Sequence, residues 1–177
     1  MSHCTVNNIK ASCKLLGLDI TAKLRFLASN NLSVSKKKSN FFVFRDKCVY
    51  IIFYTGHVNI TGARSRSALD EARNYLSTVV EKFELKLSCV TIDNICLSGK
   101  LPTTVNLIHF SDKLLQHCIT FCYNPRKFPG LSFASAERRS GTTIVFASGK
   151  FIIVGLKEED QVIRAEAHLI DLINKYG

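Results

Sequence analysis

The feature that most constrains the fold of this chain is a segment that occurs twice. It reads Phe146-Ala-Ser-Gly149-Lys-Phe-Ile-Ile-Val-Gly155 in one place and Phe53-Tyr-Thr-Gly56-His-Val-Asn-Ile-Thr-Gly62 in the other. In both, a strand-forming run ends in Phe, a Ser-Gly or Thr-Gly pair follows, and a second strand closes on Gly, which is typical of a β-hairpin. A helical pattern follows each hairpin. The chain therefore contains an internal repeat.

Further landmarks extend the repeat along the chain. Residues 4–15 and 89–101 both alternate like strands, and Asn8 and Asn94 are each followed by Ile and, three residues further on, by Ser. A short helix is expected next, at 19–29 in the first copy and at 111–118 in the second, where Ser111 would be the N-cap. A longer helix after each hairpin is predicted from apolar residues at i, i+3, i+4 spacing. These residues are Leu69, Ala72, Leu76, Val79, Val80 and Phe83 in the first copy, and Val162, Ile163, Ala167, Leu169, Ile170 and Ile173 in the second.

Alternation within the hairpins predicts an exposed binding face. The residues expected to point toward the helices are Val58, Ile60, Phe151 and Ile153. Those expected on the opposite face are His57, Asn59, Thr61, Lys150, Ile152 and Val154. Two helices per copy can cover only one side of a sheet. The uncovered side would then carry a contiguous apolar patch, which usually marks a binding surface.

Composition narrows the class of partner. With 177 residues, 46% of them hydrophobic, the chain suits one compact domain or two small halves that share a core. It has no apolar window of about 18 residues that could span a membrane. Seven cysteines without a regular framework favour a reducing compartment. The net charge of +10 favours a polyanionic partner, with nucleic acid the first expectation and an acidic protein surface the second.

On these residues the chain resembles the core domain of the TATA-binding protein family over nearly its full length. The most specific matches are Tyr123-Asn-Pro-Arg-Lys-Phe-Pro-Gly-Leu131 and Ile144-Val-Phe-Ala-Ser-Gly-Lys150. The resemblance implies an α+β saddle of two quasi-symmetric β-α-β-β-β-β-α halves, residues 1–85 and 86–177, with a curved antiparallel sheet and four helices on its convex side. It also implies a general transcription initiation factor that binds A/T-rich promoter DNA through the minor groove and bends it with Phe wedges.

The resemblance also assigns roles to single residues. Phe128 and Phe146 correspond to one pair of wedges, and Phe53 belongs to the other pair together with either Phe41 or Phe42. Central hydrogen bonds to the bases would come from Asn and Thr, with Val154 in place of the second Thr. The full set of implied DNA-binding residues is Asn8, Lys10, Phe41, Phe42, Ile51, Phe53, His57, Asn59, Thr61, Asn94, Cys96, Phe128, Ile144, Phe146, Lys150, Ile152 and Val154.

Several residues depart from the family pattern. Lys10 and Asn59 make the first half less apolar, and Val154 removes a hydrogen-bond donor from the second half. All three favour the alternative of an interaction module whose saddle binds protein instead of DNA. Implied partners are a transcription factor IIB-like protein and RNA polymerase, but basic Arg126 and Lys127 stand where eukaryotic members carry acidic residues, so an altered contact is expected. The chain is expected to act as a monomer on DNA, with self-association in its absence left open. A nuclear or viral transcription site, and a viral or parasitic source, are expected from small size, a missing N-terminal tail and divergence.

Enzymatic chemistry is not indicated. Gly149 and Lys150 do not form a phosphate-binding Walker motif, because Ile144 and Phe151 occupy the places of its first Gly and its Ser or Thr. His117, Cys118 and Cys122 lack a second ligand pair with zinc-finger spacing. The prediction is therefore no enzyme, no metal and no cofactor.

Overall fold

The computed structural model describes residues 3–30, 34–135 and 141–177, and they form two compact units. The N-terminal unit comprises residues 8–93. The C-terminal unit comprises residues 94–177 together with the start of the chain up to Asn7. Strands β1 (His3–Leu16) and β7 (Thr91–Lys100) therefore contribute residues to both units. The repeat boundary after residue 85 stays a prediction.

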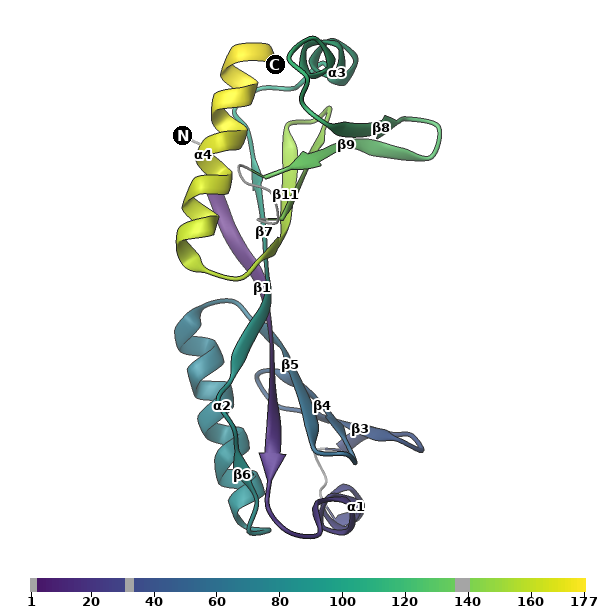
Figure 1. The fold of residues 1–177 in the computed structure, drawn as a ribbon, viewed down its shortest axis with the longest axis vertical. Helices are drawn as coiled ribbons and strands as arrows, with labels where there is room; N and C mark the ends of the chain where they lie inside the picture. The colour runs from purple at the N-terminus through teal and green to yellow at the C-terminus, as the bar shows by residue number, and fades with distance from the viewer. Residues whose placement is uncertain (1–2, 31–33, 136–140) are drawn as a thin grey trace. The chain divides into compact units, whose positions relative to one another are not determined.

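In the N-terminal unit, five antiparallel strands lie in the order β2-β3-β4-β5-β1, and the short strand β6 also pairs with β1 (Figure 1). The elements after β1 are α1 (Ile20–Asn30), β2 (Val34–Lys37), β3 (Phe41–Arg45), β4 (Val49–Phe53), β5 (His57–Ala63), α2 (Arg66–Glu81) and β6 (Lys86–Leu87). Helix α2 contacts β5 and β6.

The C-terminal unit repeats this arrangement with the strand order β7-β11-β10-β9-β8. Its elements after β7 are α3 (Leu107–Gln116), β8 (Phe121–Asn124), β9 (Phe128–Ala134), β10 (Thr142–Phe146), β11 (Lys150–Leu156) and α4 (Glu159–Tyr176). Helix α4 contacts both β11 and α3. Each unit thus has the predicted β-α-β-β-β-β-α order.

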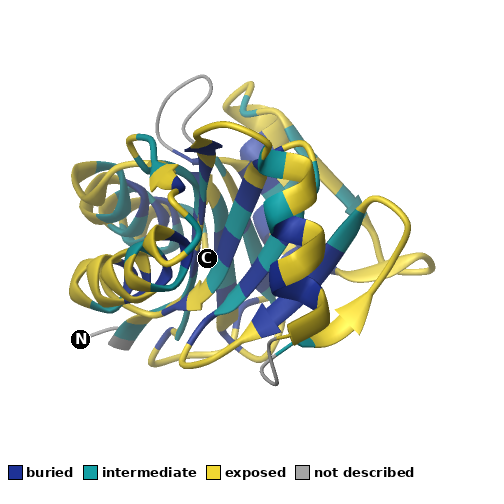
Figure 2. Ribbon diagram, turned by 90° about the horizontal axis from the view of Figure 1, so that it is seen from below, coloured by how far each residue is buried: buried dark blue, intermediate teal, exposed yellow. Residues whose placement is uncertain are grey.

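The core of each unit lies between strands and helices, as the alternation predicts. In β1, Ile9, Ala11 and Cys13 are buried, while Lys10 and Lys14 between and beyond them are exposed. Figure 2 shows buried residues concentrated along the strands and exposed residues on the outer sides of the helices. The four hairpin residues predicted to face the helices, Val58, Ile60, Phe151 and Ile153, are all buried. Each such apolar side chain contributes about 1.5–3 kcal/mol on burial, so this one face stabilises the unit.

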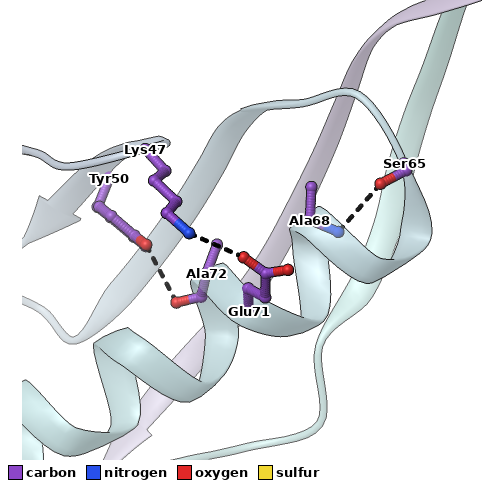
Figure 3. Close-up of polar contacts among 6 residues, drawn as sticks. All are labelled: Lys47, Tyr50, Ser65, Ala68, Glu71 and Ala72. Atoms are coloured by element: carbon purple, nitrogen blue, oxygen red, sulfur yellow. Dashed lines mark hydrogen bonds and ion pairs between the residues drawn. The ribbon is translucent and has the colours of Figure 1, made fainter.

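Polar contacts tie the first hairpin to α2 (Figure 3). Ser65 is the N-cap of the helix, and its Oγ accepts a hydrogen bond from the Ala68 N–H at 3.1 Å. The buried Tyr50 hydroxyl donates to the Ala72 carbonyl at 3.1 Å. Lys47 and Glu71 also form an ion pair, but both side chains are exposed and the pair contributes little. The tyrosine therefore ties α2 to the sheet, and the cap determines where the helix begins.

Two helix predictions were wrong in detail. Helix α3 begins at Leu107 with Asn106 as its N-cap, whereas Ser111 lies inside the helix and donates back to the Ile108 carbonyl. The buried stripe of α4 consists of Ala165, Leu169 and Leu172, and the predicted Ile163 is 71% exposed. This helix carries apolar residues on more than one side, so spacing alone did not determine which side packs. None of the described helices is both long and apolar enough to span a membrane.

Candidate nucleic-acid interface

Each unit has a strand face opposite its helices, which we call the open face. The predicted site residues lie there with intermediate or high exposure in every case but one. Half-buried members are Asn8, Phe41, Ile51, Phe53, Asn59, Thr61, Asn94, Cys96, Ile144, Phe146, Ile152 and Val154, and exposed members are Lys10, His57, Phe128 and Lys150. The exception is Phe42, which is fully buried. Burial raises the pKa of the Cys96 thiol, so this side chain is neutral at pH 7.

Two asparagines on the open faces are held by glycine bulges. Asn8 Oδ1 accepts hydrogen bonds from the Gly62 N–H at 2.7 Å and from the Thr61 hydroxyl at 3.1 Å. In the other unit, Asn94 Oδ1 accepts from the Gly155 N–H at 2.6 Å. Both glycines lie at register shifts between strands, with φ of 102° and 90°. A backbone conformation with positive φ favours glycine, and the bulge turns the glycine N–H toward the asparagine side chain.

This arrangement determines which end of each amide is available. A backbone N–H requires an acceptor, so the side-chain oxygen must be the atom that faces the bulge. The Nδ2 group is then left as a hydrogen-bond donor on the open face. Thr61 already donates its hydroxyl proton to Asn8. Val154, which occupies the place of Thr61 in the C-terminal unit, has no hydroxyl group. Each unit therefore presents one oriented amide donor on a largely apolar surface.

The C-terminal unit carries a pair of aromatic rings at the edge of its open face. Phe128 and Phe146 pack edge to face with 5.8 Å between ring centroids, and Phe128 is 47% exposed. Gly130 lies opposite Phe146 in the strand register. A Cβ on Gly130 would come within 2.7 Å of the Phe128 ring and 3.0 Å of the Phe146 ring. The two rings thus fill the space that the missing side chain leaves.

The N-terminal unit builds its pair differently. Phe41 lies directly opposite Phe53, with 5.6 Å between ring centroids. By register Phe41 therefore occupies the place of Gly130, and Ser39, two residues earlier, occupies the place of Phe128. Phe42 pairs with Ile52 on the helix side and lies against Tyr54. Between the two candidates that the sequence left open, only Phe41 is on the open face.

A groove of about 630 Å³ adjoins Phe146 in the C-terminal unit. We call it the C-terminal groove. Its polar lining consists of Thr5, Asn7, Ser98, Lys100, Ser148 and Lys150, with no carboxylate among the lining residues. Asn7 Nδ2 donates to Ser98 Oγ at 2.7 Å. Two lysines together with hydroxyl and amide groups suit an anion with several oxygen atoms, such as a phosphodiester.

Comparison with known proteins decides the family. A family model described as "Transcription factor TFIID (or TATA-binding protein, TBP)" matches residues 3–83 and 89–176. The chain belongs to the TATA-binding protein family. This is a family of transcription factors and not of enzymes, in agreement with the prediction that the chain has no enzymatic activity. The second matched range begins close to the start of β7, so both repeats belong to the family.

Individual relatives are archaeal. The chain is 33% identical over 128 residues to the TATA-box-binding protein of Sulfolobus acidocaldarius, an alignment that covers 71% of this chain and 62% of the relative. It is 28% identical over 176 residues to that of Pyrodictium occultum, covering 95% and 86% of the two chains. The solved structure of Methanococcus jannaschii TBP superposes with a TM-score of 0.74 at 24% identity, covering 98% and 99%. The chain therefore has the TBP fold, and nothing in these comparisons supports the expected viral or parasitic source.

Sequence reasoning missed several residues of this TBP-family surface. Gly62 and Gly155 were noted as ends of hairpins but not as the groups that orient Asn8 and Asn94. Their identical place in both repeats was the available signal. Asn7 and Ser98 were also missed, because their contact joins strands that are 91 residues apart in the chain. Within the described residues, no group of three His, Cys, Asp or Glu side chains could hold a metal ion.

Proposed function

We propose that this protein binds A/T-rich promoter DNA through the minor groove, bends it, and recruits transcription machinery at initiation. The observation that carries the proposal is the orientation of Asn8 and Asn94, each held so that its amide nitrogen is the free end. A·T pairs present only acceptors in the minor groove, whereas a G·C pair adds the guanine amino donor. Two fixed donors on apolar faces therefore match A·T pairs and clash with guanine.

Bending would come from the aromatic pairs. Apolar side chains that enter the minor groove partly unstack a base step and kink the duplex. Phe128 is exposed and Phe146 supports it from the neighbouring strand, so this pair suits the role of a wedge. We assign the second wedge to Phe41 with Phe53 and leave out Phe42, because a fully buried ring cannot reach DNA.

The surrounding side chains supply two further kinds of contact. Ile51, Cys96, Ile144, Ile152 and Val154 provide apolar surface against the sugars of the minor groove. Lys100 and Lys150 in the C-terminal groove would contact the phosphate backbone, with His57 and Lys10 as the basic groups of the other unit. Binding that depends on phosphate contacts weakens steeply as salt rises.

Recruitment would use the turn between β8 and β9. Arg126 and Lys127 are both exposed there, and the Lys127 N–H closes the turn on the Asn124 carbonyl at 2.9 Å. A basic turn is complementary to an acidic surface, so we propose a transcription factor IIB-like partner that presents carboxylates to it. A nuclear location stays a prediction, since the relatives named above come from organisms without a nucleus.

The alternative function, a module whose open face binds protein, rests on Val154, which has no hydroxyl to donate, and on the pair Lys10 and Asn59. Both place polar groups on the open face of the N-terminal unit, which lowers its apolar character. An open face that has lost DNA binding would show no affinity for a duplex even at low salt. The two functions can therefore be separated by one measurement.

The test is a mobility-shift and bending assay with A/T-rich and G/C-rich duplexes across a salt series. We expect binding to the A/T-rich duplex that weakens with salt, and loss of the bend in Phe128→Ala and Phe146→Ala. Phe26→Ala is the matched control, because Phe26 is 62% exposed but lies on α1. Absence of binding to any duplex at low salt would refute the proposal and favour the protein-binding alternative.

A further inference from the structure

We propose that Asp93 makes the N-terminal unit the weaker phosphate-binding half, so that the protein binds an A/T-rich site with a preferred orientation. This inference rests on the proposed DNA binding. It concerns a residue outside the predicted site.

Several residues that line the C-terminal groove have sequence counterparts in the N-terminal unit. The offset of 86 residues that relates Asn8 to Asn94 also relates Ser12 to Ser98 and Lys14 to Lys100. The same offset relates Asn7 on β1 to Asp93 on β7. Each unit includes a short part of the first strand of the other repeat, up to Asn7 in the C-terminal unit and up to Asp93 in the N-terminal unit. Asn7 accordingly contacts Ser98, and Asp93 contacts Ser12. The two pairs are thus equivalent contacts in the two units.

These equivalent contacts differ in charge. Asn7 Nδ2 donates to Ser98 Oγ at 2.7 Å, whereas the Ser12 hydroxyl donates to Asp93 Oδ1 at 3.0 Å. The direction is reversed because a carboxylate can only accept. Ser12 lies on the open face of β1, between exposed Lys10 and Lys14, so the carboxylate it contacts lies beside that face. No ion pair joins Asp93 to any lysine or arginine of the described residues.

The remaining basic groups offset each other between the two units, so Asp93 decides the difference in charge. The offset of 93 residues that relates Phe53 to Phe146 places His57 where the other unit has Lys150. The C-terminal groove therefore carries two positive charges, on Lys100 and Lys150, and no negative one. In the N-terminal unit the equivalent residues are Lys14, Asp93 and His57, and the formal net charge counts His as neutral. Lys10, whose counterpart in the other unit is Cys96, adds a second lysine on this open face, so the charges sum to +1.

This difference of one charge between the units acts directly on phosphate contacts. A neutralised phosphate changes the slope of log K against log salt by about 0.9. A carboxylate beside the phosphate path cancels one such contribution. DNA would therefore be bound more tightly by the C-terminal unit, and a site whose two halves differ would be occupied mainly in one orientation.

The experiment uses a reciprocal exchange. Asp93→Asn keeps an acceptor for the Ser12 hydroxyl and removes the negative charge. We expect its slope of log K against log salt to be steeper than that of wild type by about 0.9. Its gain in DNA affinity over wild type should therefore be about 3.5-fold larger at 50 mM than at 200 mM salt. Asn7→Asp adds the charge to the other unit and should weaken binding with a shallower slope. The double exchange should restore the wild-type slope but reverse the orientation. Orientation is read by placing a photo-crosslinking base in one half of the site and identifying the crosslinked peptide.

The outcomes separate this inference from the proposed function. If Asp93→Asn leaves both the affinity and the salt slope unchanged while Phe128→Ala still abolishes the bend, the inference is wrong and the proposed function stands. If the wild-type protein binds no duplex, both fail. Thermal unfolding of each variant serves as the folding control. If the double exchange gives the same crosslink pattern as wild type, Asp93 does not determine the orientation.

Discussion

Replacing Asn94 with Asp separates the structural role of this side chain from its proposed role in DNA binding. Asn94 Oδ1 accepts the Gly155 N–H at 2.6 Å, and a carboxylate oxygen can accept the same bond. Hydrogen bonds to a charged acceptor are the stronger kind, so the bulge at Gly155 should be retained. The substitution changes only the outward end of the side chain, where an NH₂ donor becomes a second oxygen.

The expected loss of DNA affinity follows from that exchange. A good contact between a side chain and a base edge contributes about 1–3 kcal/mol of discrimination. Asn94→Asp removes the donor and brings a negative oxygen toward acceptor atoms of the base pair, so the loss should be at least about 2 kcal/mol, or about 30-fold in affinity. Unfolding should be unaffected, because no hydrogen bond within the protein is lost.

The assay measures affinity for an A/T-rich duplex and the thermal unfolding midpoint of the same preparations. Asn94→Ala is the control, because it removes the acceptor from the Gly155 N–H and should cost about 1 kcal/mol of stability, roughly 2–4 °C in Tm. Asn94→Asp should therefore bind poorly with an unchanged or higher Tm. Wild-type affinity in Asn94→Asp would refute the argument that the amide nitrogen faces DNA.

Three further substitutions test the packing of the fold and the wedge. Tyr50→Phe removes the buried hydrogen bond to the Ala72 carbonyl and should lower the free energy of unfolding by about 1 kcal/mol in denaturant titration, with DNA affinity unchanged. Ser65→Ala removes the N-cap of α2 and should cost about 1 kcal/mol in the same titration. Gly130→Ala places a Cβ within 2.7 Å of the Phe128 ring, so we expect a smaller bend in a gel-phasing assay with the salt slope of wild type. A full-sized bend in that variant would show that the rings do not depend on the space at Gly130.

The repeated architecture could be predicted because it depends on local signals. Each hairpin carries its own turn, its own alternation and its own closing glycine, and each signal occurs twice, so an error in one copy is checked by the other. The alternation of residues along β5 and β11 was enough to predict which of them face the helices, and the burial of Val58 and Ile153 agrees with that prediction. The predicted start of α3 was wrong for a physical reason. Asn106 and Ser111 are both good capping residues, and only the burial of Leu107 in the fold determines which of them is the N-cap.

The contacts that orient the site could not be predicted in the same way, because they join residues far apart in the chain. Nothing near Asn94 in the sequence indicates that its oxygen faces a bulge 61 residues later. The register of β3 could not be predicted either, because it depends on pairing with another strand. Phe41 and Phe42 are adjacent and identical in chemistry, and only pairing with β4 places one on the open face and buries the other. Side-chain identity was readable from the sequence, whereas the direction of each polar atom was not.

The two units keep the same scaffold and differ in what the scaffold presents. The closing glycine, the asparagine that it orients and the buried alternation are found in both, and each of these supports the backbone of its own unit. Differences such as Asp93 in the place of Asn7 and His57 in the place of Lys150 fall on side chains that are not part of the buried core. Changes at such positions cost little stability, so they can alter how each half contacts a ligand while the fold stays the same. We therefore expect the difference in charge between two such halves to favour one orientation on DNA without any change in the backbone.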